Sequence, residues 1–320
     1  MLSMRMMRET WTLAATLSLV AIACDGSGCR SRSASAARDV DAADSSIAVV
    51  TDASPDVAPR RGHRSGSDVT FAVVSDTHFG YADMTAQNQA LVRRLNAIEG
   101  RRYPASLGGI VGAPRGLVIT GDLTEWGKVD EWEAFVATYG RDGTEGALRF
   151  PVLEMIGNHD KVHGPWVEEQ VAKRHGGRFR SWDWDDLHLI ALGEAPDEEG
   201  IAFLARDLAN VDADVPVVLF FHLALEGPWS TDNWFADGGF KERLFAAIAG
   251  HDVVGIFHGH HHATAHYRWR GIDVWKPGAV KNGAHTFAVA HLTDTHFTVA
   301  SFDWDRERWG EVSVKERKKR

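Results

Sequence analysis

The sequence predicts an α/β fold. From Val69 onward, short apolar runs that are typical of buried strands alternate with segments whose apolar residues recur at helical spacing. After residue 265 the helical spacing ends, and shorter strand patterns separated by turn residues follow. We therefore expect a single α/β domain whose last third is mainly β-structure.

Six apolar runs are expected to be buried strands. They cover residues 69–74, 116–120, 151–156, 187–192, 215–221 and 253–257. Between several of them lie helical patterns in which apolar side chains share one face. The residues on these faces are Leu91, Leu95 and Ile98; Trp132, Phe135, Val136 and Tyr139; and Phe240, Leu244 and Ile248. The β-rich end is expected in residues 266–275, 286–292 and 296–302.

Residues 1–23 have the pattern of a signal peptide. Arg5 and Arg8 precede an apolar stretch, residues 11–23, which has the length of a signal-peptide core and is short for a permanent membrane helix. Cys24 follows, and the sequence VAIAC resembles a bacterial lipobox, in which a small residue precedes a lipidated cysteine. We expect a lipoprotein held to the membrane through Cys24. The alternative is an ordinary cleaved signal with Cys24 and Cys29 paired, and both place the protein outside the cytoplasm, in the bacterial cell envelope.

The regions that flank the expected domain have a different composition. Residues 24–67 are rich in Ser, Ala, Asp, Gly and Arg, and such a segment cannot bury enough apolar surface to fold, so we expect a disordered tether. The folded domain is expected in residues 68–304, followed by a charged tail in residues 305–320. No cysteine follows residue 29, so the domain needs neither disulfides nor thiolate metal sites. The net charge of −9 argues against a nucleic-acid partner.

Polar side chains that can bind metal follow five of the expected strands directly. In open α/β sheets, ligands bind at the carboxyl ends of the strands. The five groups are Asp76 and His78; Asp122; Asn158, His159 and Asp160; His222; and His260 and His262. Glycines at positions 121, 157 and 259 directly precede three of these groups, where a close or unusual backbone turn is expected. We therefore expect a metal site at this edge of the sheet.

The number of candidate ligands exceeds what one ion needs. Two carboxylates, one amide oxygen and four imidazoles make seven groups, whereas a single Zn²⁺ binds four. If one carboxylate bridges, seven groups can serve two ions. Nitrogen and oxygen ligands without thiolate suit Mn, Fe, Zn or Ni rather than Ca. Two such ions about 3.5–4 Å apart bind a phosphoryl group and activate a hydroxide between them.

The five polar groups together resemble the signature of a known family. The blocks Asp76-x-His78, Gly121-Asp122, Gly157-Asn158-His159-Asp160, His222 and Gly259-His260-x-His262 are similar to those of the calcineurin-like metallophosphoesterase superfamily. The resemblance spans about residues 69–302. It implies a four-layer αββα sandwich of two mixed β-sheets flanked by helices. It also implies two divalent or trivalent transition-metal ions, with Mn, Fe or Zn as the expected metals.

The resemblance also implies a role for each residue. One ion is expected on Asp76, His78, Asp122 and His262, and the other on Asp122, Asn158, His222 and His260, with Asp122 bridging. His258 is expected to pack or to support the site, and His261 to point away from it. A metal-bridging hydroxide would attack phosphorus, and His159 would protonate the leaving group or stabilise the transition state. Glu125 stands where the family often has an Asp, so we expect it to orient His159. The alternative for Glu125 is a carboxylate at a helix start.

The branch of the family follows from local features. Purple acid phosphatases carry a metal-bound Tyr where this chain has Glu125, so we do not expect that branch. The periplasmic nucleotidases have a large second domain, for which we expect no room in this chain. Residues 120–135 most resemble the single-domain bacterial phosphodiesterases, including the cyclic-nucleotide group. We expect hydrolysis of phosphodiesters, or of phosphomonoesters as the second option. The competing hypothesis is a metal-binding surface scaffold without activity. Residues 226–235, which include two tryptophans, are expected to shape the mouth of the pocket.

Overall fold

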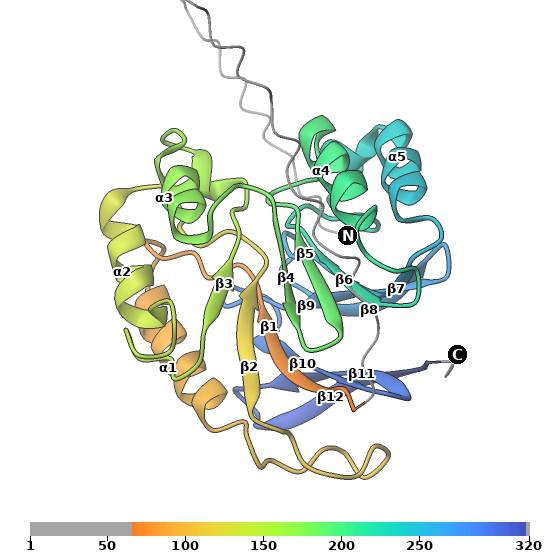
Figure 1. Ribbon diagram of the computed structural model, residues 1–320. Helices are drawn as coiled ribbons and strands as arrows, with labels where there is room; N and C mark the ends of the chain where they lie inside the picture. Colours follow the sequence, from red (N-terminus) through yellow and green to blue (C-terminus); the bar gives the residue numbers. More distant parts are fainter. Residues whose placement is uncertain (1–65, 318–320) are drawn as a thin grey trace, which may run out of the picture. The chain divides into compact units, whose positions relative to one another are not determined.

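The described part of the chain, residues 66–317 of a computed structural model, forms two six-stranded mixed sheets (Figure 1). In spatial order, the strands of the first sheet are β12 (Arg308–Glu316), β11 (His296–Asp303), β10 (Thr286–Thr293), β1 (Asp68–Val74), β2 (Pro114–Ile119) and β3 (Val152–Glu154). Those of the second sheet are β4 (Arg180–Trp184), β5 (Leu187–Ala191), β6 (Pro216–Phe220), β7 (Asp252–Phe257), β9 (Ile272–Pro277) and β8 (Thr264–Trp269). In each sheet a run of parallel strands, β1–β2–β3 or β5–β6–β7–β9, is bordered by antiparallel strands.

Helices cover the outer face of each sheet (Figure 1). On one side lie α1 (Met84–Asn96), α2 (Val129–Tyr139) and α3 (Trp166–His175). On the other side lie α4 (Glu198–Leu208) and α5 (Gly238–Ile248). Two short 3₁₀ helices, His159–Lys161 and Trp234–Ala236, lie in the loops between these elements. The expected four-layer αββα sandwich is therefore confirmed.

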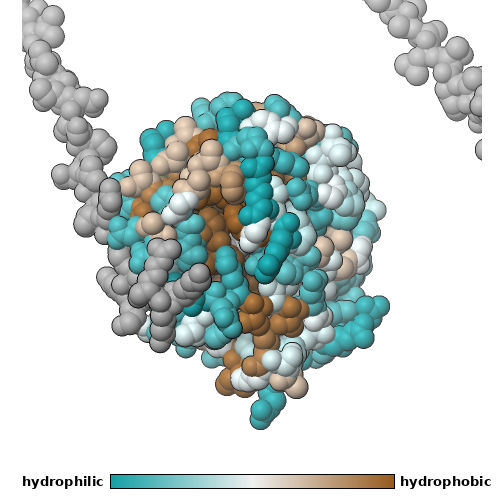
Figure 2. All heavy atoms as spheres, turned by 90° about the vertical axis from the view of Figure 1, so that its right-hand side faces the viewer, coloured by the Kyte–Doolittle hydropathy of each residue, from teal (hydrophilic) through white to brown (hydrophobic). Residues whose placement is uncertain are grey.

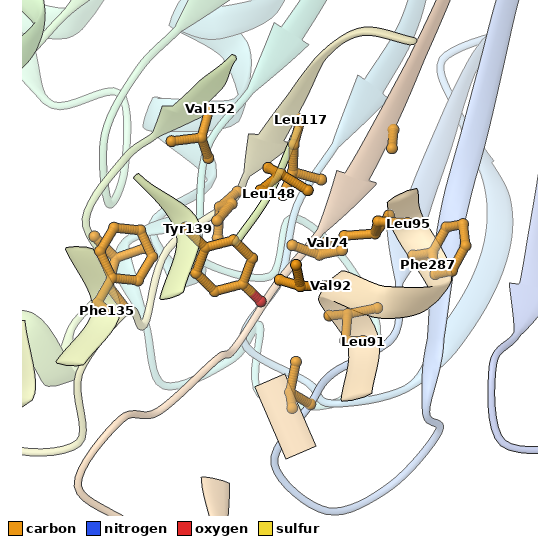
Figure 3. Close-up of a cluster of buried hydrophobic side chains, with 14 of the residues drawn as sticks. Val74, Leu91, Val92, Leu95, Leu117, Phe135, Tyr139, Leu148, Val152 and Phe287 are labelled. Atoms are coloured by element: carbon orange, nitrogen blue, oxygen red, sulfur yellow. The ribbon is translucent and has the colours of Figure 1, made fainter. Parts of the chain in front are cut away.

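Three hydrophobic clusters hold the four layers together. The first lies between the first sheet and its helices, and Figure 3 shows Leu91 and Leu95 of α1 facing Val74 of β1. The second lies between the two sheets, and the third between the second sheet and α4 and α5. In β1, Val74 belongs to the first cluster, while its neighbour Val73 belongs to the second. Side chains alternate faces along a strand, so a strand buried on both sides needs an unbroken apolar run.

The C-terminal boundary of the domain differs from the expected one. We expected residues 305–320 to form a charged tail, but Arg308–Glu316 is strand β12, antiparallel to β11. The ring of Trp309 lies 5.1 Å from that of Phe302, so this strand contributes to the packing. An edge strand exposes one face to water, and its charged residues there produce the composition of a tail. The domain therefore extends through β12.

The surface carries few large exposed hydrophobic side chains. Figure 2 shows one face, on which hydrophobic residues gather in separate patches with hydrophilic residues between them. In residues 66–317, three of the exposed side chains are tryptophans, Trp126, Trp229 and Trp234, and all three lie in loops that follow strands. Among these residues no helix has the length and apolar character needed to cross a membrane. The expected signal peptide, Cys24 and nearly all of the expected tether lie outside the described residues.

Candidate metal centre

The loops that follow the parallel strands bring the expected ligands together. Four of them form one group, in which one nitrogen or oxygen atom from each residue lies within 4.8 Å of the others. This group consists of Asp76, His78, Asp122 and His262. His262 Nε2 lies 3.2 Å from Asp76 Oδ1, and His78 Nε2 lies 3.5 Å from Asp122 Oδ2. Two atoms bound to one tetrahedral ion at about 2.1 Å lie about 3.4 Å apart, so the four residues can hold one ion.

A second group shares Asp122 with the first. It consists of Asp122, His222 and His260. His222 Nε2 lies 3.2 Å from Asp122 Oδ2 and 3.1 Å from the Asn158 side-chain oxygen, so Asn158 joins this group. All seven expected ligands are therefore in two adjoining groups, with Asp122 in both. This arrangement is a candidate site for two metal ions.

The chemistry of the donor atoms fits a cation between them. His222 Nδ1 lies 2.8 Å from the carbonyl oxygen of Thr120, which can only accept, so Nδ1 carries a hydrogen. In neutral His222, Nε2 then directs its lone pair at the oxygens of Asp122 and Asn158. Lone pairs repel one another, and a cation between them removes this repulsion. Burial disfavours a charged His222, but the Asp122 carboxylate outweighs burial and raises the pKa of His222 to about 10. The site therefore favours positive charge, which metal ions can supply in place of a proton on His222.

The pKa values of both buried aspartates are lowered, although burial alone would raise them. Burial favours neutral Asp76, yet hydrogen bonds with His262 and His78 outweigh it and hold the pKa of Asp76 well below its usual range. Burial likewise opposes ionisation of Asp122, but His222 and His78 lower the pKa of Asp122 to about 2. By contrast, burial and then the charge of His222 lower the pKa of His260 to about 4, which keeps its imidazole neutral and able to bind metal. Ionised carboxylates and a neutral imidazole are the forms that bind metal.

The ligand loops have an unusual backbone. Non-glycine residues seldom adopt the left-handed conformation, and each instance costs about 1–3 kcal/mol. Five ligands have it, with φ angles of 56° at Asp76, 44° at His78, 51° at Asp122, 72° at His260 and 53° at His262. Such strain persists where the surrounding contacts impose it, and it is typical of ligand-binding sites.

The glycines noted in the sequence allow these loops to pack closely. A Cβ atom at Gly259 would lie 1.9 Å from Ser75 Oγ and 2.7 Å from Asp76 Oδ2. A Cβ atom at Gly157 would lie 2.5 Å from the backbone nitrogen of Asp122. Only glycine leaves room for these contacts, so both residues help to place the ligands.

Asp160 fastens two of the ligand loops to each other. Its carboxylate accepts hydrogen bonds from the backbone N–H groups of Leu123, Thr124 and Gly157, at 3.1, 2.8 and 2.8 Å. Burial, and then the charge of Asp122, raise the pKa of Asp160 to about 6. The sequence placed Asp160 among the polar groups but did not reveal this role, because backbone donors carry no side-chain signature.

The partner of Glu125 differs from the expected one. Its Oε2 lies 2.7 Å from Nδ1 of His78, whereas its Oε1 is 3.9 Å from Nδ1 of His159. His159 Nδ1 instead lies 2.9 Å from the carbonyl oxygen of Glu125. The carboxylate of Glu125 therefore orients His78, and the main chain of Glu125 orients His159. The carboxylate that caps the start of α2 is that of Glu131, which accepts a hydrogen bond from the backbone N–H of Lys128.

The remaining histidines of the 258–262 segment lie outside both ligand groups. His258 is buried, with Nε2 2.8 Å from the hydroxyl of Tyr267, which agrees with the packing role expected for it. His261 Nδ1 lies 3.3 Å from Nζ of Lys276. A lysine that faces an imidazole nitrogen in this way was not foreseen from the sequence.

A cavity of about 620 Å³ opens beside the second ligand group. Its lining residues are Asn158, Glu194, Leu223, Trp229, Asp232, Asn233, Trp234 and His260. The ring of Trp229 lies 5.5 Å from that of His260 and 5.9 Å from that of His262. The loop after His222 therefore borders the metal centre, as expected from the sequence.

Comparison with known proteins establishes the family. Residues 69–264, more than half of the chain, match the family model described as calcineurin-like phosphoesterase. The chain belongs to this family and is a phosphoric ester hydrolase. It is 27% identical over 259 residues to a probable cyclic nucleotide phosphodiesterase of Rhodopseudomonas palustris. The aligned segment covers 71% of this chain and 82% of that protein. It is 31% identical over 225 residues to the glycerophosphodiester phosphodiesterase GpdQ of Enterobacter lignolyticus, which covers 62% of this chain and 73% of that protein.

Solved structures share the fold at low sequence identity. The purple acid phosphatase PPD1 of yellow lupin (Lupinus luteus) has a TM-score of 0.57 at 11% identity, over 80% of this chain and 55% of that chain. GAP50, the anchor in the inner membrane complex of Plasmodium, has a TM-score of 0.55 at 10% identity, over 79% of this chain and 90% of that chain. These similarities support the two-sheet sandwich described above.

Proposed function

We propose that this chain is a two-metal phosphodiesterase. The observation that carries the proposal is that two groups of buried ligands share the carboxylate of Asp122. When bound, the ions would supply an activated water for attack on phosphorus and positive charge for the phosphoryl oxygens. The mixed nitrogen and oxygen ligands favour Mn, Fe or Zn.

The protein side chains would hold the ions and move a proton. Asp76, His78, Asp122 and His262 would hold one ion, and Asn158, His222 and His260 would hold the other together with Asp122. The main-chain carbonyl of Glu125 accepts from Nδ1 of His159, so Nε2 is the nitrogen that can give a proton to the leaving oxygen. His159 is 30% exposed at its side chain, so a substrate can reach it.

Phosphodiesters are the substrates that the cavity favours. None of its eight lining residues, within the described part of the chain, is a lysine or arginine, and Lys161 nearby is ion-paired with Glu194. A diester carries one negative charge, whereas a monoester carries up to two and benefits more from such cations. Both curated relatives are named as phosphodiesterases, which supports the same choice. The indoles of Trp229 and Trp234 offer flat apolar surfaces for the alcohol part of the ester.

The test compares two chromogenic substrates. The purified full chain would be assayed with bis-p-nitrophenyl phosphate and with p-nitrophenyl phosphate, in Mn²⁺, Fe²⁺ or Zn²⁺ and in chelator, beside an Asp122→Asn variant. We expect turnover that requires metal, is lost in the variant and is faster with the diester. Faster turnover of the monoester would overturn the diesterase proposal, and absence of turnover with every metal would overturn the activity.

We also propose that the protein works outside the cytoplasm, held by a lipid on Cys24. The signal-peptide pattern of residues 1–23 and the VAIAC sequence support this location. Fractionation of bacterial cells that express the full chain, or a Cys24→Ser variant, tests it. We expect the full chain in the membrane fraction and the variant outside that fraction. Recovery of both from the cytosol would contradict the proposal.

A further inference from the structure

The loop of residues 278–285 supports one half of the metal centre. It connects β9 of the second sheet with β10 of the first sheet. The backbone N–H groups of Val280 and Lys281 both donate to the carbonyl oxygen of Asp76, at 3.2 Å. The N–H of Ala284 donates to the carbonyl oxygen of His262, also at 3.2 Å. The loop therefore holds the main chain of two ligands of the first group.

The side chain of Lys281 reaches a third ligand of that group through Glu125. Its Nζ lies 2.8 Å and 2.6 Å from the two carboxylate oxygens of Glu125. The same carboxylate lies 2.7 Å from Nδ1 of His78. A carboxylate at Nδ1 keeps the hydrogen on that atom, which leaves the lone pair of Nε2 for a metal ion. Lys281, Glu125 and His78 thus form a continuous chain of contacts.

Lys281 is suited to keep Glu125 in this orientation. Glu125 is only 4% exposed, and a buried carboxylate needs a compensating charge to remain ionised. The ammonium group supplies this charge to both oxygens, and it also lies 4.3 Å from the ring centre of Tyr81, which limits its own movement. Without Lys281, Glu125 would lose the interactions that fix its carboxylate against His78.

The second ligand group lacks this support. Among the hydrogen bonds of residues 66–317, none joins the 278–285 loop to Asn158, His222 or His260. His222 is oriented instead by the carbonyl oxygen of Thr120. A change at Lys281 should therefore act on the two halves of the centre unequally.

We propose that Lys281 is a positioning residue that acts through Glu125 on His78 and sets the affinity for one of the two ions. The ion concerned is the one held by Asp76, His78, Asp122 and His262. This inference rests on the two-ion centre of the proposed function. The affinity for the ion at Asn158, His222 and His260 does not depend on Lys281.

The test measures metal binding without substrate. The full chain would be stripped of metal and titrated with Mn²⁺ by calorimetry, as wild type and as Lys281→Met and Lys281→Arg. We expect Lys281→Met to weaken one ion by about 10- to 100-fold, the range known for such supporting residues, and the other by less than about twofold. The arginine variant should recover part of the loss, because it keeps the positive charge. Lys315→Met removes a half-buried lysine of β12 and should leave both affinities unchanged.

Three further variants identify the ion and the route. Asp76→Asn should weaken the same ion as Lys281→Met, and His222→Ala should weaken the other. Glu125→Gln combined with Lys281→Met should lose no more affinity than the stronger single variant, since both changes break one chain of contacts. Additive losses, equal weakening of the binding of both ions, or weaker binding of the ion at His222 would overturn the inference.

If circular dichroism shows that Lys281→Met is unfolded, Glu125→Gln and Lys281→Arg give the same comparison. A chain that binds two ions but turns over no phosphodiester would refute the proposed function and leave this inference intact.

Discussion

Two clusters of buried charge in this protein are balanced in opposite ways. In the first, Glu154 of β3 is completely buried, with Nε of Arg174 at 2.7 Å and Nε2 of His175 at 2.9 Å. Arg180 of β4 donates to its main-chain carbonyl at 2.6 Å. In the second, the metal centre, Asp76 and Asp122 are as deeply buried. Within residues 66–317, however, their ion-pair partners are histidines alone.

The difference indicates which cluster can accept an external ion. Arginine is always protonated, so Glu154 carries its counter-charge permanently from the chain itself. Histidine is charged only while a neighbour stabilises its protonated form, so the counter-charge of Asp76 and Asp122 is not permanent and can be exchanged for that of a metal ion. A buried carboxylate without a counter-charge is costly, and a metal ion removes the cost. Glu154 is therefore balanced by fixed charges of the chain itself, whereas the aspartates are balanced by histidines whose charge a metal ion can replace.

Asp122→Asn should abolish function while sparing the fold. The variant removes the one carboxylate that both ligand groups share, and with it several kcal/mol of transition-state stabilisation, about 10³-fold in rate. Nitrophenol release and metal content would be measured together. The exposed Asp130→Asn at the start of α2 is the control and should remain active. Full activity of Asp122→Asn with two bound ions would break the contrast between the clusters.

Glu154→Gln should do the reverse, with a large loss of stability. Burial alone would raise the pKa of Glu154, but the hydrogen bond with His175 and the charges of Arg174 and Arg180 outweigh it and lower the pKa. Replacing the carboxylate by an amide leaves the buried guanidinium groups of Arg174 and Arg180 without a counter-charge, so we expect the free energy of unfolding at pH 7 to fall by about 3 kcal/mol. Urea unfolding measures it.

The loss of stability in Glu154→Gln should depend on pH. Because the folded chain lowers the pKa of Glu154, its ionised form stabilises the protein above the unfolded value of about 4.3. This contribution disappears as pH falls from about 4.3 through the lower folded pKa. The difference in the free energy of unfolding between wild type and Glu154→Gln should therefore shrink below about pH 4. The exposed Glu133→Gln on α2 should change stability by less than about 0.5 kcal/mol. A gap that stays constant down to unfolding would contradict the assignment.

His159→Asn should reduce turnover without changing metal binding. His159 lies outside the ligand groups that share Asp122, and proton transfer of this kind contributes about 10²-fold or more to rate. The loss in kcat should be smaller for a nitrophenyl ester than for an alkyl ester, since nitrophenolate leaves without a proton. Equal losses for the two leaving groups would exclude His159 as the acid.

Trp229→Ala should have the smallest effect, confined to substrate binding. The indole is 48% exposed and lies against His260 at the cavity, so its loss should leave stability nearly unchanged. We expect KM for bis-p-nitrophenyl phosphate to rise about fivefold, since an aromatic pair contributes about 1 kcal/mol. A fall in kcat at unchanged KM would show instead that Trp229 orders the metal ligands.

The sequence predicted the strands better than the rest of the fold. The expected strand 69–74 is observed as Asp68–Val74, and 253–257 as Asp252–Phe257, because both are apolar runs buried on two faces. No pattern pointed to α3, in which only Val167 and Val171 are buried. Strands β4 and β12 were missed because edge strands mix polar and apolar residues.

What the sequence alone determined is the set of candidate metal ligands. All seven follow strand ends, and their identity depends on short-range spacing such as that of Asp76 and His78, which local geometry preserves. The tertiary structure decided how these ligands are supported. Glu125 lies three residues from Asp122, yet its carboxylate faces His78 and is held by Lys281, 156 residues further along the chain. A side chain's direction depends on everything packed around it, and those neighbours come from distant segments that only the folded chain brings together.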